Sequence, residues 1–129
     1  MSQENVEVVR DAYDALSSRG LDAFSNYWAA DIDWQTMRHR WWGRKAGRAY
    51  LQELFDLFDD FTTEPLELID AGEDRVVVYL RYRGLSKRGG IPVPFEYFAI
   101  VIRVRDGEIA QASEYATRQE ALEAVGLSE

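Results

Sequence analysis

The sequence predicts one domain of the α+β class, in which helices are segregated from a mostly antiparallel sheet. In the first half of the chain, apolar residues recur mainly at helical spacing. In the second half they alternate with polar residues, as in strands that bury one face. At 129 residues, the chain has the length of one ordinary domain with its own core, so residues 1–129 are treated as a single domain.

Three helices are expected before residue 60. The first carries a helical apolar repeat and ends at Gly20; the repeat is Val6, Val9, Ala12, Tyr13 and Leu16. A short second helix is predicted over residues 22–29 and a third over residues 44–58. Residues 31–37, between these two helices, predict a strand with Trp34 and Thr36 on one face.

Four further strands are expected, over residues 62–71, 75–83, 92–105 and 108–116. Pro65 favours an edge position for the first of them, because proline cannot donate a ladder hydrogen bond. Asp106-Gly107 indicates a two-residue hairpin turn. Thr117 and Glu120 have the spacing of a capping box, which predicts a last helix.

The strand over residues 92–105 predicts a pocket. Its even-numbered row is apolar and should face the core; this row is Phe98, Ile100, Ile102 and Val104. Glu96 belongs to the same row, and a carboxylate aimed at a core is costly unless it is paired or lines a wet cavity. A bent sheet closing over helices leaves a cone with one open end, and ligand sites prefer such concavities.

Composition excludes several classes of function. The net charge of −8 disfavours nucleic acid and anionic membranes as partners. The absence of cysteine excludes disulfides, thiol catalysis and thiolate metal sites, and fits a cytoplasmic location. The start of the chain lacks the features of a signal peptide, and no apolar run approaches the ~20 residues that span a bilayer. His39 is the only histidine, and no nucleotide-binding motif is present, so neither a metal nor a cofactor is expected.

Three strings resemble the SnoaL-like branch of the NTF2-like (ketosteroid isomerase-like) superfamily. They are ENVEVVRDAYDAL, RVVVYLRYRG and VRDGEIAQASEYATRQEALEAVGL. The resemblance implies a cone-shaped fold, with a curved mixed or antiparallel sheet packed against N-terminal helices. It also implies an apolar pocket in each subunit and a homodimer formed through the sheet.

Two enzyme branches of this superfamily match the sequence poorly. Ketosteroid isomerases use a helix Tyr, which Tyr13 resembles, but their two Asp positions fall here at Thr36 or Met37 and at Ile100. Epoxide hydrolases of the limonene type use an Arg-x-Asp pair, and Leu80-Arg81-Tyr82 stands at that place. Their water clamp is replaced by Trp34-Gln35-Thr36, and only Glu114 resembles one of their acids. Polyketide cyclases of the SnoaL type use an acidic base in the pocket, which Glu114 or Glu96 could supply.

Glu114 is the first candidate for catalysis. If the last strand faces inward at Ala112, Glu114 and Ala116, the small residues leave room around a carboxyl group. Burial would then raise its pKa toward the range useful to a general acid or base. The structural alternatives are that Glu114 pairs with an arginine and that Glu96 lies at the rim in water. Tyr13 is the candidate hydrogen-bond donor to a substrate oxygen, or else an ordinary core aromatic.

Eight further residues are predicted to contact a ligand: Trp34, Thr36, Arg38, His39, Leu80, Tyr82, Phe98 and Ile100. Residues 37–48 also hold five of the fifteen basic side chains and no acid; these are Arg38, Arg40, Arg44, Lys45 and Arg48. This basic segment either recruits an anionic ligand or a partner's acidic face, or is a solvated loop and helix start.

The sequence therefore predicts a protein that binds a small, apolar, oxygenated organic ligand. As an enzyme it would be a cofactor-independent isomerase, cyclase or dehydratase with Glu114 as acid or base, Tyr13 as donor and Glu96 as auxiliary acid. The alternative is a non-catalytic ligand-binding or dimerisation domain, and an epoxide hydrolase is the third possibility.

Overall fold

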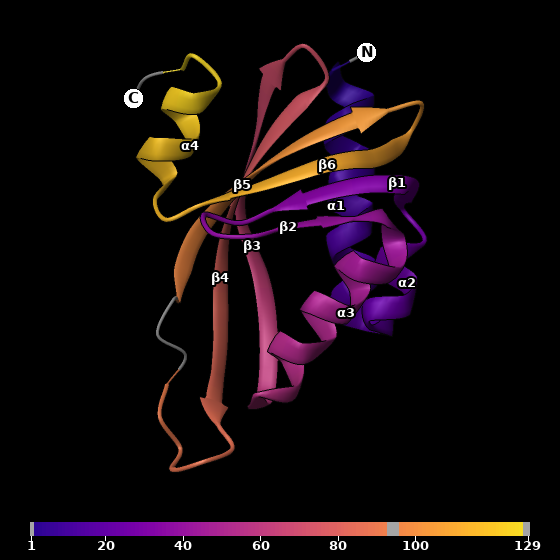
Figure 1. Cartoon of the computed structure of the whole chain (residues 1–129). Coiled ribbons are helices and arrows are strands. Elements are labelled where there is room, and N and C mark those ends of the chain that lie inside the picture. The colour runs from indigo at the N-terminus through magenta and orange to yellow at the C-terminus, as the bar shows by residue number, and fades with distance from the viewer. Residues whose placement is uncertain (1, 93–95, 128–129) are drawn as a thin grey trace.

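The computed structural model describes residues 2–92 and 96–127, which form a curved, unclosed six-stranded sheet with four helices (Figure 1). In chain order, the elements are α1 (Ser2–Arg19), α2 (Leu21–Ser25), β1 (Trp28–Gln35), β2 (Arg40–Trp42), α3 (Gly43–Asp56), β3 (Phe58–Gly72), β4 (Arg75–Ser86), β5 (Tyr97–Arg105), β6 (Glu108–Tyr115) and α4 (Arg118–Ala124). The strand order is β2-β1-β6-β5-β4-β3. Neighbouring strands are antiparallel except for β1 and β6, which are parallel. The predicted α+β class is confirmed.

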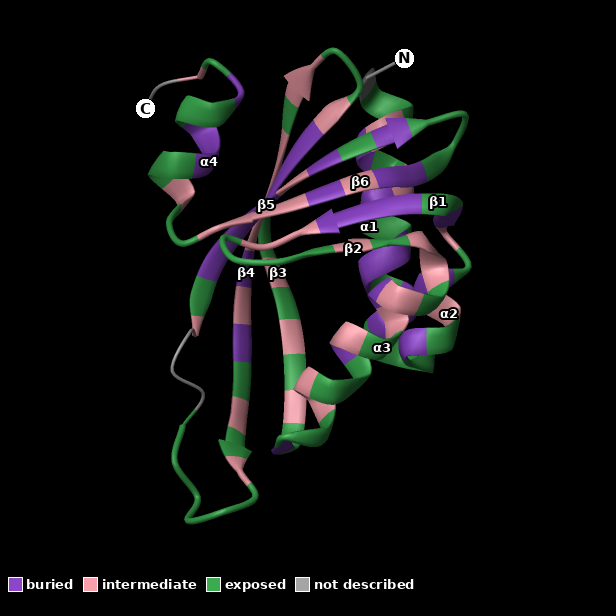
Figure 2. Ribbon diagram, in the orientation of Figure 1, coloured by how far each residue is buried: buried purple, intermediate pink, exposed green. Residues whose placement is uncertain are grey.

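The two faces of the sheet are covered differently. Helices α1, α2 and α3 lie on one side of the sheet, and α4 lies on the other (Figure 1). The main core lies under the first three helices, and a smaller cluster around Val77 and Ala99 lies under Leu122 of α4. Along β5, buried and exposed residues alternate only from Ile102 to Arg105; Phe98, Ala99 and Ile100 are all buried, because α4 covers Ala99 on the second face of the sheet (Figure 2).

The helices before residue 60 are present, with two changes of boundary. Helix α2 ends at Ser25, and residues 28 and 29 belong to β1 instead. Trp28 pairs with Ile109 of β6 and is fully buried, so sheet pairing overrides the helical spacing that predicted residues 22–29. Phe58 begins β3 rather than ending α3.

Strand β2 was not predicted from the sequence. It pairs antiparallel with β1 through Trp34 and Trp41, and forms one edge of the sheet. Its three residues are too few to show an alternating pattern, and they lie in the basic segment. The β1–β2 hairpin explains why residues 36–39 form a tight connection.

The later strands follow one another along the chain as predicted, with shifted boundaries. Strand β3 lies at the other edge of the sheet, as Pro65 indicated. Strand β5 begins at Tyr97 rather than Pro92, which forms only an isolated bridge with Leu85. Residues 93–95 of the predicted strand lie outside the described residues.

The predicted turn and cap are confirmed in detail. Asp106 and Gly107 both have positive φ, 54° and 77°, as a type I′ hairpin turn requires. The Thr117 hydroxyl accepts a hydrogen bond from the Glu120 amide at 3.1 Å, which caps α4. Among the described residues, no helix is long and apolar enough to cross a membrane.

Candidate functional site

A pocket of about 730 Å³ opens between the β1–β2 hairpin, α3 and the adjacent ends of β5 and β6. Its volume lies in the range of small-molecule sites. Six of the residues predicted from the sequence line it: Thr36, Arg38, His39, Tyr82, Phe98 and Glu114. The other lining residues are Met37, Trp41, Tyr50, Leu54, Tyr97, Tyr115 and Ala116.

Glu114 is the carboxylate of this pocket. Two neutral donors reach it: the Trp34 indole Nε1 donates to Oε2 at 2.7 Å, and the Tyr50 hydroxyl donates to Oε2 at 3.1 Å. Glu114 lies on the same inward-facing row of β6 as the fully buried Ala112, as the sequence predicted. No cation within residues 2–92 and 96–127 forms an ion pair with Glu114. The predicted alternative, in which it pairs with an arginine, is not observed there.

This environment favours the protonated form of the carboxyl group. Burial raises the pKa of Glu114, and the hydrogen bonds from Trp34 and Tyr50 offset only part of that increase. A carboxyl group held by neutral donors in an apolar pocket can exchange protons with a bound molecule.

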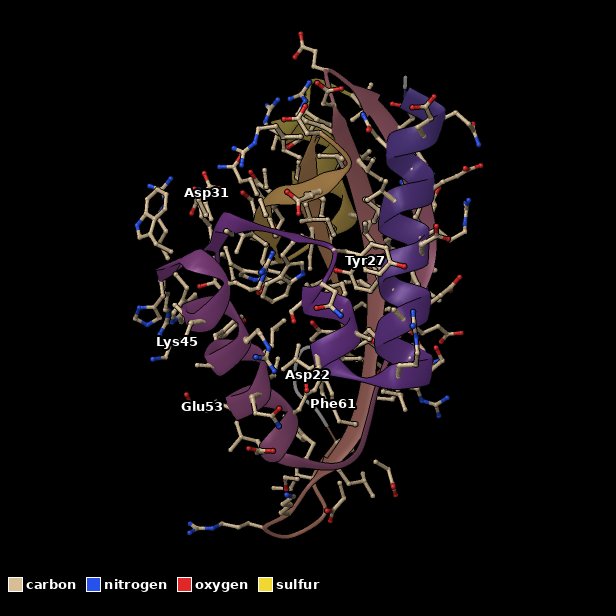
Figure 3. The ribbon with its side chains drawn as sticks, turned by 90° about the vertical axis from the view of Figure 1, so that its right-hand side faces the viewer. Asp22, Tyr27, Asp31, Lys45, Glu53 and Phe61 are labelled. Carbon is tan, nitrogen blue, oxygen red and sulfur yellow. The ribbon has the colours of Figure 1, made fainter. Side chains whose placement is uncertain are left out.

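Aromatic rings form the walls. Trp41 and Tyr50 are stacked, with centroids 4.1 Å apart and planes 16° apart, and Tyr82 meets Phe98 edge to face at 4.4 Å. Phe61, a residue of β3, packs edge to face against Tyr82, and Figure 3 shows it on the side of β3 that faces α3. The pocket therefore offers flat apolar surfaces around one acid.

Four residues predicted to contact a substrate lie in the core instead of lining the pocket: Tyr13, Trp34, Leu80 and Ile100. Each is at most 2% exposed, because α1 and α2 cover the inward rows of the sheet. Trp34 still acts on the site through its bond to Glu114. The Tyr13 hydroxyl has no hydrogen-bond partner among the described residues, and burial raises its pKa, with the charge of Glu114 adding to the increase.

Glu96 does not reach the pocket. Its carboxylate accepts a hydrogen bond from Arg81 Nε at 2.6 Å, and it is not among the lining residues. The regular strand begins only at Tyr97, so the alternation that predicted an inward Glu96 does not extend to it. The neighbouring guanidinium gives the carboxylate a partner away from the core.

Tyr50 and Trp41 are pocket residues that the sequence analysis did not select. Tyr50 lies one helical turn before Leu54, an apolar residue of the same helix that also lines the pocket. That spacing could have assigned Tyr50 to the same face. No comparable signal existed for Trp41, since its position depends on the unpredicted strand β2.

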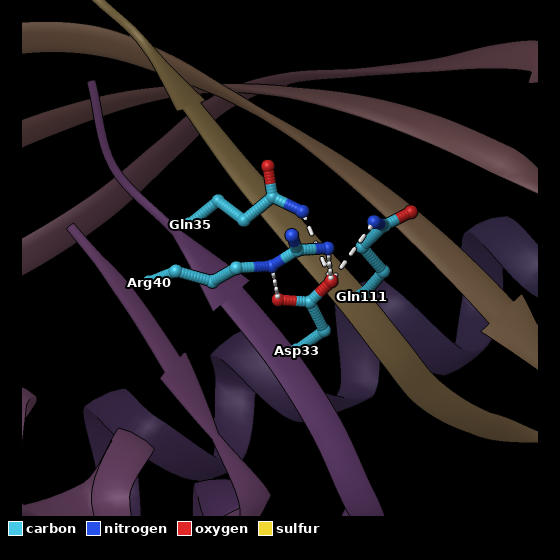
Figure 4. Close-up of polar contacts among 4 residues, drawn as sticks. All are labelled: Asp33, Gln35, Arg40 and Gln111. Atoms are coloured by element: carbon cyan, nitrogen blue, oxygen red, sulfur yellow. Dashed lines mark hydrogen bonds and ion pairs between the residues drawn. The ribbon is translucent and has the colours of Figure 1, made fainter. Parts of the chain in front are cut away.

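The structure separates the five cations of the basic segment. Arg40 is bound by Asp33 on the sheet face opposite Trp34, with Nε and Nη2 at 2.8 and 2.7 Å from the carboxylate oxygens (Figure 4). Gln35 and Gln111 also donate to Asp33. These contacts hold β2 against β1 and lower the pKa of Asp33, chiefly through the hydrogen bond from Arg40.

Of the four other cations in the basic segment, three lie on α3 and one lines the pocket. Arg44 donates to the backbone oxygen of Trp28 at 2.5 Å, and Arg48 pairs with Asp22 of α2. Lys45 is exposed on the outer side of α3 (Figure 3). Only Arg38, of these five, lines the pocket. No group of three or more potential metal-ligating side chains is found within the described part of the chain.

Solved structures share this fold. A hypothetical protein from Catenulispora acidiphila with a ketosteroid isomerase-like fold, crystallised with trimethylamine, is 21% identical, with 94% of this chain and 93% of that chain covered and a TM-score of 0.71. A putative polyketide cyclase from Sinorhizobium meliloti is 24% identical, with 89% and 99% covered and a TM-score of 0.69. TerC, co-crystallised with polyporic acid, is 17% identical, with 95% and 97% covered and a TM-score of 0.74.

No curated protein matches the sequence significantly. A family profile does match: that of the SnoaL-like domain, over residues 9–112. This match spans most of the chain and agrees with the curved sheet, the helical layer and the fold of the solved neighbours. The chain belongs to the SnoaL-like domain family.

Proposed function

We propose that this protein binds a small, largely apolar oxygenated molecule and transfers protons on it, with Glu114 as general acid or base. The observation that carries the proposal is a pocket carboxyl group whose only hydrogen-bond donors within the described chain are neutral. Such a group can gain or lose a proton without first breaking an ion pair. The reaction class is isomerisation, cyclisation or dehydration, with no cofactor.

The chemical step is a proton transfer beside a carbonyl group. The ionised Glu114 carboxylate removes a proton from a carbon next to the carbonyl, and the electron pair moves into an enolate. The resulting carboxylic acid returns the proton at a different atom, or protonates a departing hydroxyl group. A carboxyl pKa raised toward the working pH suits both directions.

Binding without turnover is the second candidate. One position where related isomerases carry an acid is occupied here by Ile100, which has no group to donate or accept a proton. Ile100 is fully buried and pairs with Glu114 in the sheet register, so its place beside Glu114 is apolar. Epoxide hydrolysis has less support, because Leu80 lies in the core and Arg81 pairs with Glu96.

The test combines titration with turnover. A carbon-13 NMR titration, assigned by comparison with Glu114→Gln, should show a Glu114 pKa above the ordinary glutamate range. A thermal-shift screen of ketones, lactones, epoxides and aromatic acids should then identify binders, which raise the melting temperature by mass action. For a binder that is turned over, Glu114→Gln should reduce kcat by about 100-fold or more.

Glu108→Gln is the matched control, because it removes one carboxylate from the exposed start of the same strand. Its activity should equal that of the parent protein. An ordinary Glu114 pKa, together with binders that are never turned over, would favour the binding-only function.

A further inference from the structure

We infer that the ligand is a planar aromatic acid, held with its carboxylate against Arg38 at the pocket mouth and its opposite end against Glu114. This inference rests on the proposed function, since it names the ligand class of the same pocket. Three features of the pocket support it: a cation without an ion-pair partner among the described residues, an internally bonded turn that carries this cation, and the placement of charges along the pocket.

Arg38 is the available cation. Arg40, Arg44 and Arg48 are engaged by Asp33, a backbone oxygen and Asp22 respectively. The Arg38 side chain forms no ion pair with any described residue, and it is exposed where it lines the pocket. A guanidinium in this position can form two parallel hydrogen bonds to a carboxylate.

The turn that presents Arg38 is internally bonded. The Thr36 amide donates to the His39 oxygen at 2.8 Å, and the Thr36 hydroxyl accepts from the amides of Arg38 and His39 at 3.3 and 3.1 Å. His39 also packs against Trp41, with centroids 5.6 Å apart. Because these contacts hold the mouth in place, little backbone order must be gained when an anion binds.

The pocket walls determine the shape of the ligand. The stacked pair of Trp41 and Tyr50 presents a flat surface, and Tyr82 with Phe98 forms a second aromatic surface at the inner end. Flat apolar surfaces favour a ring system, which they can contact by offset stacking or edge to face.

The charges orient that ring system. Glu114 is the one carboxyl group among the described lining residues; it offers an anion no positive charge at its own end of the pocket, and repels an anion whenever it is ionised. Arg38, which is exposed where Glu114 is more buried, attracts an anion at the mouth of the pocket, in a protein whose net charge of −8 otherwise disfavours anions. An aromatic carboxylate therefore binds in one direction, which places its uncharged or oxygen-bearing end next to Glu114.

Two probes of equal shape test the inference: 2-naphthoate, which is anionic, and 2-naphthamide, which is neutral. Binding is followed by NMR at pH 7 and low salt through the Trp34 indole N–H, which is bonded to Glu114. We expect 2-naphthoate to bind about threefold to fivefold more tightly, the range of an accessible ion pair. The preference should shrink as salt is added.

Charge reversal localises the effect. Arg38→Glu should abolish or invert the preference for naphthoate, whereas Lys45→Glu, which changes net charge equally on the outer side of α3, should leave it intact. Equal binding of the two probes to the parent protein, or equal losses in both variants, overturns the ligand class while leaving the pocket. If neither probe shifts the Trp34 signal, the inference fails, and the proposed function is then decided separately by the screen of ketones, lactones and epoxides and by the Glu114 titration.

Discussion

Asp33 and Glu114 are two carboxylates on neighbouring strands whose surroundings give them opposite properties. Asp33, on β1, is 7% exposed and accepts hydrogen bonds from Arg40, Gln35 and Gln111 (Figure 4). Glu114, on β6, accepts bonds only from neutral donors among the described residues. The pKa of Asp33 is lowered, mainly by the hydrogen bond from Arg40, and that of Glu114 is raised by burial.

The difference shows how a fold separates a structural acid from a chemical one. A carboxylate paired with a guanidinium is held in its ionised form and stabilises the folded chain. A carboxyl group without a cation costs folding free energy when ionised, but its raised pKa lets it gain a proton more readily than an ordinary glutamate does. Both arise from one sheet, because successive residues of β1 point to opposite faces and direct Asp33 away from Glu114's partner Trp34.

Removing the structural acid should have the largest effect. Asp33→Ala leaves Arg40 and two amides without their acceptor and removes the side-chain ion pair between β1 and β2, so we expect a loss of about 2 kcal/mol in unfolding free energy. Chemical denaturation at pH 7 measures it. The control is Asp31→Ala on the same strand, whose ion pair with Arg105 is exposed and should contribute little.

If both aspartate variants lost the same stability, Asp33 would be an ordinary surface acid and the comparison with Glu114 would not hold. Because Arg40 also stacks over Trp42 at 4.3 Å, the fluorescence of Trp42 provides a second signal. Its emission should change in Asp33→Ala and remain unchanged in Asp31→Ala.

The pH dependence of stability should have opposite signs at the two acids. The lowered pKa of Asp33 stabilises the fold above the unfolded value near 4, and that contribution is lost as the pH falls through the folded pKa. The raised pKa of Glu114 destabilises the fold as the pH rises from about 4 through its folded pKa.

Two variants separate these contributions. Relative to the parent protein, Asp33→Asn should lose stability at pH 7, and the deficit should shrink in acid. Glu114→Gln should be more stable than the parent protein at pH 7, and this gain should shrink in acid. The gain should be smaller than the stability that Asp33→Ala loses. Thermal unfolding from pH 3 to pH 8 measures both, and parallel curves for the two variants would contradict the assignment.

The fold was largely predictable because its patterns are local. The helical repeat of Val6 to Leu16, the Asp106-Gly107 turn and the Thr117 cap each depend on a few adjacent residues, and all three were found. The short strand β2 was not, because its pairing with β1 is set by the hairpin rather than by its own three residues.

The candidate site was predictable only in part, for the same reason. Alternation along the last strand identified Glu114, and the basic segment directed attention to Arg38. The partners of each charge depend on contacts between distant residues, such as Arg81 with Glu96 and Trp34 with Glu114. Sequence spacing therefore located Glu114 but misplaced Glu96, and it did not reveal which of the two acids has a cation as its partner.

The smallest expected effect sharpens the account of Glu114 itself. Tyr50→Phe removes an O–H donor to the carboxylate while keeping the ring stacked on Trp41. Because hydrogen bonds to the ionised form lower a carboxyl pKa, the pKa of Glu114 should rise further, with a stability change of roughly 0.5–1 kcal/mol. Tyr27→Phe, outside the pocket, is the matched control and should leave the carbon-13 titration of Glu114 unchanged. If Tyr50→Phe left the Glu114 titration unmoved, the hydroxyl would not be a donor to this acid in solution, and burial with Trp34 alone would govern its protonation.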